Sequence, residues 1–412
     1  MDVRINGPLI GSIDMGTTKV SAMLGERLGD SVRIIGFGMT GAEGLRQGVV
    51  VDIEKATRSV ATAVADAERM AGTSLRQFSV GVAGEHILSM NSRGVVGIPN
   101  QDVEITREDV ERSLSAAANF ALPTDREILH TLPQQYIIDN QDGIREPSGM
   151  YGTRLESRAH VVTASRAAMD NIAKTLDNCH LEIDELVLEP LASSAAVISD
   201  DEREIGVMLI DIGGGTTDVL IYREDGVVAS GVIGIGGNNI TSDIAYGLRT
   251  AVRAAEAIKI EHGCALSSAT SLHEQIDVPG IGFREEKKVG KHFLAGIIEP
   301  RVKELFSLIN DQITTSEYKK SLGAGVVLTG GSSMLAGAQE LAEQVFDLPV
   351  RIGTPVAVDG LAEVVNHPKY ATGVGLLLYD GVWSANRPDR APSSKWWRQS
   401  VTHLRKAIAG FI

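Results

Sequence analysis

The sequence predicts an α/β protein made of two similar halves that face each other across a cleft. Residues 207–222, VMLIDIGGGTTDVLIY, place two apolar runs on either side of a glycine cluster. This is the pattern of two buried strands joined by a tight turn. Residues 9–24, LIGSIDMGTTKVSAML, repeat the arrangement. Because each copy is followed by another strand, a helical region and a further strand, we predict an internal duplication of a βββαβ unit.

The two copies correspond residue by residue at their turns. Asp14 matches Asp211, and the second turn is two glycines longer. Glycines in such a turn let backbone N–H groups point into its concave side, where an anion binds. A hairpin whose glycines serve only the turn is the alternative for a single copy, but two facing copies favour a two-sided phosphate site. Its predicted residues are Gly16, Thr17 and Thr18 on one side and Gly213, Gly214, Gly215, Thr216 and Thr217 on the other.

Composition limits the possible functions. The chain has 412 residues, enough for two or three domains, and its formal charge of −14 argues against a nucleic-acid partner. Cys179 and Cys264 stand far apart and form no metal-binding spacing, so a reduced cytosolic compartment is expected. No signal peptide is expected, and no window reaches the roughly 18 apolar residues of a membrane span.

Periodicity predicts the elements of both halves. In the first half a strand is expected at 31–39, a helix at 54–71 and a strand at 78–82. In the second half the strands at 226–233 and 324–329 take the matching places. The helix at 54–71 repeats small or apolar residues at the i, i+4, i+7 spacing of one buried face, namely Ala56, Val60, Ala63, Val64 and Ala67.

Residues 84–163 do not fit the duplicated pattern. A helix is expected at 106–118, with Thr106 and Asp109 as a capping box at its start. These residues predict an inserted α+β subdomain. Its strands are expected at 126–132, 135–139 and 158–163, with a turn at Asp142-Gly143.

Two helices of the second half have predicted starting points. Residues 292–309 are expected to be helical after Pro300, which would occupy a first-turn position. Residues 235–248 are expected to open a helix after glycines. The side chains available to cap that helix are Thr241, Ser242 and Asp243.

The C-terminal end differs in composition from the body. Residues 384–394 are rich in Pro, Ser and charge, which is typical of a flexible linker. Residues 395–412, KWWRQSVTHLRKAIAGFI, carry a formal +4, which leaves −18 on residues 1–394. Apolar and basic positions fall on opposite faces of a helix, the pattern of an in-plane membrane anchor; docking on the acidic body is the alternative. The predicted membrane-binding residues are Trp396, Trp397, Arg398, Val401, Leu404, Arg405, Lys406, Ile408 and Phe411.

The two turns resemble the phosphate motifs of the actin-like ATPase fold, in which duplicated ribonuclease-H-like βββαβα halves surround a nucleotide cleft. LEPLA at 188–192 is similar to the first connecting segment of that fold, and TGVGLLLY at 372–379 is similar to the second. GVVLTGGSSMLA at 325–336 resembles the adenosine motif. The resemblance extends over nearly the whole chain.

This resemblance implies ATP and Mg²⁺ as ligands. The implied catalytic acids are Glu189, which would orient an attacking water, and Asp14 and Asp211. One acid behind each phosphate turn fits Mg²⁺ held by Asp14 and Asp211 largely through water, although turn-stabilising hydrogen bonds are the simpler role. Lys19 follows the first turn and would contact the β- and γ-phosphates.

The resemblance also implies a nucleoside site. Glu256 and Lys259 lie three residues apart on one face of a helix expected at 252–260, which alone fits a surface ion pair. In the actin-like fold these two positions reach the ribose and adenine. The adenosine motif would contribute Gly330, Gly331 and Ser332.

The inserted segment narrows the resemblance to one family. ERSLSAAANF at 111–120 and LPQQYIIDNQDGIREPSGMYGTRLES at 132–157 resemble the inserted subdomain of the FtsA family of bacterial cell-division proteins. This implies an ATP-binding protein with at most weak ATPase activity. It would polymerise on the cytoplasmic face of the inner membrane at the division site, with its C-terminal helix on anionic lipids.

The same resemblance implies partners. The protein would tether filaments of the tubulin-like protein FtsZ to the membrane and recruit later division proteins through the insertion. The FtsZ C-terminal tail would dock near Arg301 and Glu304, for which a solvated helix face is the alternative.

The implied domains follow the same comparison. Residues 1–83 and 164–198 form the first half, 84–163 the insertion, 199–237 and 306–383 the second half, 238–305 its smaller subdomain, 384–394 a linker and 395–412 the membrane helix. Two other classes share the fold: a metabolite kinase, which has no use for a membrane tail, and a pilus-assembly module that binds a peptide, which ends without an amphipathic helix.

Overall fold

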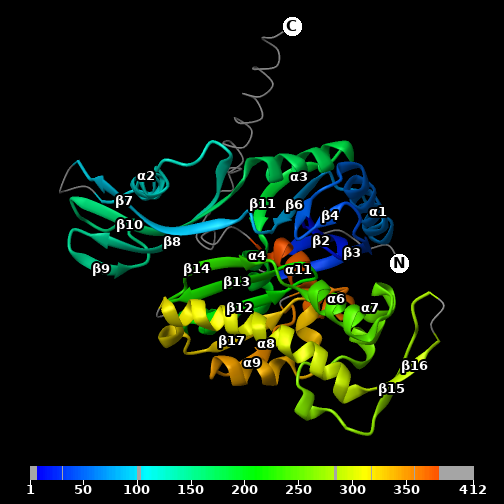
Figure 1. Cartoon of the computed structure of the whole chain (residues 1–412). Coiled ribbons are helices and arrows are strands. Elements are labelled where there is room, and N and C mark those ends of the chain that lie inside the picture. The colour runs from blue at the N-terminus through cyan, green and yellow to red at the C-terminus, as the bar shows by residue number, and fades with distance from the viewer. Residues whose placement is uncertain are drawn as a thin grey trace.

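The computed structural model describes residues 7–29, 31–99, 104–282, 285–316, 318–356 and 358–379. The predicted linker at 384–394 and membrane helix at 395–412 lie outside these residues. Figure 1 shows two sheet-centred halves stacked on each other, with a smaller subdomain extending from one side. No helix in the described part of the chain combines the length and the apolar character that crossing a membrane requires.

The first half is a six-stranded sheet in the order β11-β6-β1-β2-β3-β19. Its three leading strands are antiparallel neighbours, whereas β6 runs parallel to β1 and carries the chain back beside the first turn. The strands are β1 (Leu9–Met15), β2 (Lys19–Leu28), β3 (Ser31–Gly41), β6 (Gln77–Val82), β11 (Glu182–Leu188) and β19 (Val358–Gly360), with a short hairpin β4 (Leu45–Arg46) and β5 (Val49–Val50). The helices are α1 (Ile53–Ala71), α3 (Arg166–Asn178), α4 (Glu189–Val197) and α11 (Ala371–Leu378).

The second half repeats this arrangement in a five-stranded sheet, in the order β14-β13-β12-β17-β18. The predicted duplication is therefore confirmed. Its strands are β12 (Val207–Ile212), β13 (Thr217–Arg223), β14 (Gly226–Ile233), β17 (Gly325–Thr329) and β18 (Val350–Ile352), and a separate hairpin pairs β15 (Gln275–Val278) with β16 (Lys287–Gly290). The helices are α5 (Asp200–Ile205), α6 (Gly237–Leu248), α7 (Val252–His262), α8 (Lys291–Thr315) and α9 (Ala338–Phe346), whereas α10 (Ala362–Val365) follows β19 and belongs to the first half.

Strand β12 is buried along its whole length and contributes to two cores. Val207 and Leu209 belong to the core shared with the first half, while Met208 and Ile210 face the core beneath the helices of the second half. Successive side chains of a strand point to opposite faces, so a continuous apolar run is what a strand covered on both sides requires. This explains why VMLIDI precedes the turn.

Helix α1 forms as its sequence predicts. Its N-terminal Asp52 accepts a hydrogen bond from the Lys55 N–H, and Gly72 ends the helix at φ 67°. The predicted stripe of small and apolar residues is buried, and it packs the helix on β3 and β2.

The inserted subdomain is a four-stranded sheet, ordered β7-β10-β8-β9, with α2 packed on β7 and β10. The capping box of α2 is present, because the Thr106 and Asp109 side chains each bond the other's backbone N–H. Its elements are β7 (Leu88–Gly97), α2 (Arg107–Ala117), β8 (Arg126–Ile138), β9 (Gln141–Ile144) and β10 (Arg154–Ser165).

The two strands predicted at 126–132 and 135–139 are one strand, β8. Pro133 pairs with Ala159 and Gln135 with Arg158, so Gln134 is an extra, bulged residue. A bulge absorbs the interruption that proline causes in the hydrogen-bond ladder.

The predicted start of one helix and the predicted capping residues of another are wrong. Pro300 lies inside α8, which runs unbroken from Lys291. Because proline has no N–H, the Gly296 carbonyl one turn earlier loses its helical hydrogen-bond donor. Both residues are exposed, so water can solvate that carbonyl. Helix α6 begins after Gly236, whose N–H donates to the Asn239 side chain. The expected capping residues Thr241, Ser242 and Asp243 lie within the helix instead.

Polar side chains join the insertion to the edge strand β14 of the second half. His160 Nδ1 lies 2.8 Å from Asn91 Oδ1, and its Nε2 lies 2.8 Å from Ser230 Oγ. Asn91 also donates to the Val228 carbonyl at 3.0 Å, and the bulged Gln134 donates to Asn91 Oδ1 at 2.9 Å. Burial lowers the pKa of His160 to about 4, so its imidazole is neutral here.

We expect Asn91→Ala to destabilise the protein, because it leaves His160, Gln134 and the Val228 carbonyl each short of a partner. The free energy of unfolding should fall by about 1–3 kcal/mol, measured by urea denaturation. Asn119→Ala, an exposed site in the same subdomain, is the matched control. Equal stability of the two variants would contradict the prediction.

Candidate functional site

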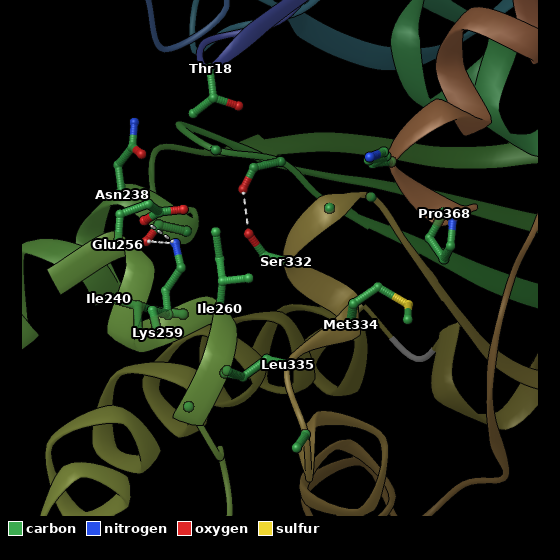
Figure 2. A pocket seen from close by; sticks show the side chains of 18 of the residues that line it. Thr18, Asn238, Ile240, Glu256, Lys259, Ile260, Ser332, Met334, Leu335 and Pro368 are labelled. Atoms are coloured by element: carbon green, nitrogen blue, oxygen red, sulfur yellow. Dashed lines mark hydrogen bonds and ion pairs between the residues drawn. The ribbon is translucent and has the colours of Figure 1, made fainter. Parts of the chain in front are cut away.

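A pocket of about 760 Å³ lies between the two halves. In Figure 2 the first half contributes Thr18 above it, Glu256 and Lys259 stand on one wall, and Ser332 and Met334 stand on the opposite wall. The pocket is lined by both turns and by the helices that follow the second turn. The predicted residues that line it are Asp14, Gly16, Thr17, Thr18, Lys19, Glu189, Asp211, Gly213, Gly214, Thr216, Glu256, Lys259, Gly330, Gly331 and Ser332.

The two turns face each other at close range. A side-chain carbon on Gly214 would overlap Thr18, and one on Gly215 would lie 2.9 Å from Thr17 Cγ2. Only glycine permits this approach, which is the reason for the additional glycines of the second turn. Gly215 therefore packs against the first turn and does not line the pocket. Thr217 is fully buried and donates to the Ile235 carbonyl at 2.7 Å.

Four carboxylates gather where the two turns meet: Asp14, Asp211 and Asp218 are buried, and Glu189 is half-buried. Burial, followed by the neighbouring acids, raises the pKa of Asp211 to about 6 and that of Asp218 to about 8. Burial also raises the pKa of Glu189 well above its usual range, with Asp14, Asp218 and Asp211 adding to the effect. The cluster therefore has a deficit of positive charge.

Lys19 supplies part of the missing positive charge. It forms an ion pair with Asp14 Oδ2. Burial opposes its charge, but Asp14, with Glu189 and Asp211, outweighs burial and raises the pKa of Lys19. Lys19 therefore places one positive charge directly after the first turn.

Glu189 is fixed by the backbone on both sides of it. It begins α4, directly after β11, and the preceding N–H of Leu188 donates to His130 Nε2 at 3.0 Å. Strand β6 passes beneath it at Gly81, where a Cβ atom would lie 2.9 Å from Glu189 Cγ. The glycine therefore makes room for the glutamate, and the side chain faces the pocket.

The acid cluster fits a divalent cation held through water. Among the described residues no three His, Cys, Asp or Glu side chains are placed to hold a metal directly. Asp218 is 3% exposed, and its Oδ1 has no hydrogen-bond partner in the described structure. An orphaned carboxylate oxygen beside other buried acids is suited to the ordered water of a hydrated Mg²⁺.

The wall of the pocket that was predicted to contact a nucleoside is built around Lys259. Its Nζ lies 2.7 Å from Glu256 Oε2 and donates to the Gly237 carbonyl at 3.0 Å and to Thr241 Oγ1 at 2.9 Å. Opposite, Ser332 Oγ donates to the Gly213 carbonyl at 3.0 Å. The Ser332 bond ties the segment after β17 to the second turn, whereas the Lys259 bonds join α7 to α6. Figure 2 marks the bonds of Ser332 and Lys259 with dashed lines.

Several lining residues were absent from the sequence prediction. Asp218 follows the second pair of threonines, at the position that Lys19 takes in the first copy, so the duplication itself could have indicated it. Ile240, Ile260, Met334 and Leu335 form apolar walls that only the folded chain brings together. His367 and Lys369 come from the segment before α11, which contains no motif of its own.

Arg301 and Glu304 lie outside the pocket. Arg301 Nε lies 2.7 Å from Asp243 Oδ2, and its Nη1 lies 2.5 Å from Glu304 Oε2. Arg301 thus joins α8 to α6, while Glu304 remains half exposed.

Comparison with solved structures identifies the fold of the chain. The chain is similar to the PilM-PilN type IV pilus biogenesis complex, with a TM-score of 0.63 and 17% identity over 90% of this chain and 97% of that one. It is also similar to MreB5 of Spiroplasma citri bound to AMPPNP, with a TM-score of 0.56 and 13% identity over 97% of this chain and 99% of that one. The duplicated halves around a single cleft therefore form an actin-like ATPase fold.

Proteins with similar sequences identify the family of the chain. A cell division protein FtsA of Pseudomonas aeruginosa is 46% identical over 91% of this chain and 89% of its own length, and one of Neisseria meningitidis is 44% identical over 89% of each. The family model for cell division protein FtsA matches residues 208–375, and the model for the SHS2 domain inserted in FtsA matches residues 84–163. The chain belongs to the FtsA family of cell-division proteins.

The raised pKa values predict that the nucleotide-free, metal-free protein loses stability as the pH rises. Folded Asp211 and Asp218 hold protons that the unfolded chain releases near pH 4, so the free energy of unfolding falls between about pH 4 and pH 8. In EDTA at pH 8, Asp218→Asn should raise the melting temperature by at least about 2 °C, and by less at pH 5. Thermal unfolding measures this, with exposed Asp142→Asn as control. A gain that is equal at both pH values would contradict the prediction.

Proposed function

We propose that this member of the FtsA family binds ATP with Mg²⁺ in the pocket between its halves and uses the nucleotide to control self-assembly at the membrane. The observation that carries the proposal is the pair of Asp-x-Gly…Thr-Thr turns that face each other across one pocket. Each turn presents backbone N–H groups and hydroxyls, so a phosphate chain between them is bound from both halves at once. Binding of this kind fixes the angle between the halves.

The residues of the site have distinct roles in this proposal. Asp14, Asp211 and Asp218 would hold the hydrated Mg²⁺, which neutralises phosphate charge when bound. Glu189 would accept a hydrogen bond from a water and orient it toward the terminal phosphate. Burial and the neighbouring acids raise its pKa, and a bound cation would lower it again by offsetting those acids. We assign at most weak ATPase activity to the site.

Membrane attachment is assigned to the helix predicted at 395–412. One such helix binds weakly, because its apolar residues are only partly buried at an interface and the ordering of about 18 residues opposes binding. Joining several helices in one filament raises the avidity by about 10²–10⁴ without any new contact. Support for assembly comes from the fold, since the MamK double helical filament is a neighbour with a TM-score of 0.51 and 15% identity.

Partner binding completes the proposal. FtsZ filaments would be tethered through their C-terminal tail near Arg301 and Glu304, and later division proteins through residues 84–163. The exposed carboxylate of Glu304 is the accessible member of that pair, because Arg301 is engaged by Asp243. The protein would then lie on the cytoplasmic face of the inner membrane at the division site.

Isothermal titration tests the nucleotide site. The full chain should bind ATP, and Mg²⁺ should increase its affinity. Asp14→Asn combined with Asp211→Asn should reduce that Mg²⁺-dependent gain by about 10-fold, because the carboxylates that hold the water shell are gone. Exposed Asp142→Asn is the control. A wild-type chain that binds no ATP would overturn the proposed function.

Liposome co-sedimentation tests the membrane anchor. With vesicles containing phosphatidylglycerol, Trp397→Asp should abolish most binding, because it places a charge in the apolar stripe. Gln399→Asp, on the opposite face of the predicted helix, should keep most of it. ATP should increase binding of the wild-type chain through assembly. Equal binding by both variants would contradict the anchor, and binding that ignores ATP would contradict the avidity argument.

A further inference from the structure

Four lysines line the described part of the pocket, and they differ in their partners. Three have carboxylate partners: Lys19 with Asp14, Lys259 with Glu256 at 2.7 Å, and Lys291 with Glu274 at 3.0 Å. Lys369 forms no ion pair with any described residue. A cation without a counter-charge, on the wall of a pocket suited to a polyanion, is available to the ligand.

The backbone of Lys369 is held in place by the adenosine motif. It belongs to the single 3₁₀ turn Pro368–Tyr370, and its N–H donates to His367 Nδ1 at 3.1 Å. The Pro368 carbonyl accepts from the Gly330 N–H at 3.3 Å and from Thr329 Oγ1 at 3.4 Å. The turn is therefore fixed to the end of β17, the strand beside β12 and its phosphate turn.

The ammonium group of Lys369 shares an aromatic neighbour with Lys19, which follows the first turn. Its Nζ lies 4.7 Å from the centre of the Tyr370 ring, and Lys19 Nζ lies 6.0 Å from the same ring centre. Tyr370 is buried and is itself fixed edge-on against Phe37 at 5.1 Å. Both ammonium groups therefore lie near the same fixed ring. The nucleoside wall, in contrast, is built on α7 around Glu256.

We propose that Lys369 binds the phosphate chain of the nucleotide directly. The inference rests on the proposed nucleotide site and adds a residue that neither turn supplies. The phosphate end of the pocket contains four acids and only one paired lysine, so an incoming polyphosphate meets like charge there. Lys369 offsets that repulsion and gives the nucleotide a contact that adenosine lacks.

Titration of the full chain with ATP, ADP and adenosine tests the proposal. Lys369→Gln should weaken ATP and ADP binding by about 10- to 100-fold, as expected for the loss of a charge-assisted hydrogen bond, and leave adenosine binding unchanged. Lys369→Arg should retain most of the affinity because it keeps the charge. Lys174→Gln removes an exposed lysine of α3, outside the pocket, whose Nζ lies 3.2 Å from Asp177 Oδ2, and it should change the ATP affinity by less than about twofold.

The outcomes separate this inference from the proposed function. An equal loss for adenosine, or no loss for ATP, would overturn the role of Lys369 while the nucleotide site stands. A wild-type chain that binds none of the three ligands would overturn the nucleotide site itself. A wild-type affinity for ATP that falls more steeply with salt than that of Lys369→Gln would support the contact.

Discussion

The structure depends on the close contact between two turns that belong to different halves of the chain. Gly214 and Gly215 bring the second turn against Thr17 and Thr18 of the first, at a distance that a Cβ atom would prevent. Because strands β1 and β12 end at these turns, the contact also brings Asp14 and Asp211 together at the bottom of the pocket. The angle between the halves and the electrostatics of the site therefore follow from one steric constraint.

The acid cluster is costly for the protein without ligands. Three buried carboxylates and the half-buried Glu189, with one paired lysine, destabilise the folded state, as the raised pKa values of Glu189, Asp211 and Asp218 record. In the proposed function, a bound Mg²⁺ would offset the repulsion among these acids and between them and the phosphates. A ligand that relieves this repulsion more in one arrangement of the halves than in another would shift the equilibrium toward that arrangement.

Much of the fold could be predicted from the sequence, because the same pattern of strands and turns occurs in both halves and each copy supports the interpretation of the other. The strands around both turns, α1 and the capped helix α2 follow local rules of periodicity and capping. Pro300 in α8 and Pro133 in β8 could not be placed, because tertiary packing and a bulge override their local preference. In the site, Lys369 lies outside every motif, and Met334 lies within the motif at 325–336 without being singled out by it, so only the folded chain shows that both line the pocket.

The insertion is joined to the first half by the chain itself and to the second half by side-chain hydrogen bonds. These two connections limit how the halves can move. Its chain enters and leaves through the first half, at β6 and α3, while its sheet bonds edge strand β14 of the second half through Asn91, His160 and Gln134. The other end of β14 leads to Gly234, whose carbonyl accepts from Gln47 beside the phosphate turns. A change in the angle between the halves must therefore either break this polar contact or rotate the insertion. The polar contact through Asn91, His160 and Gln134 therefore couples the position of the insertion to the angle between the halves.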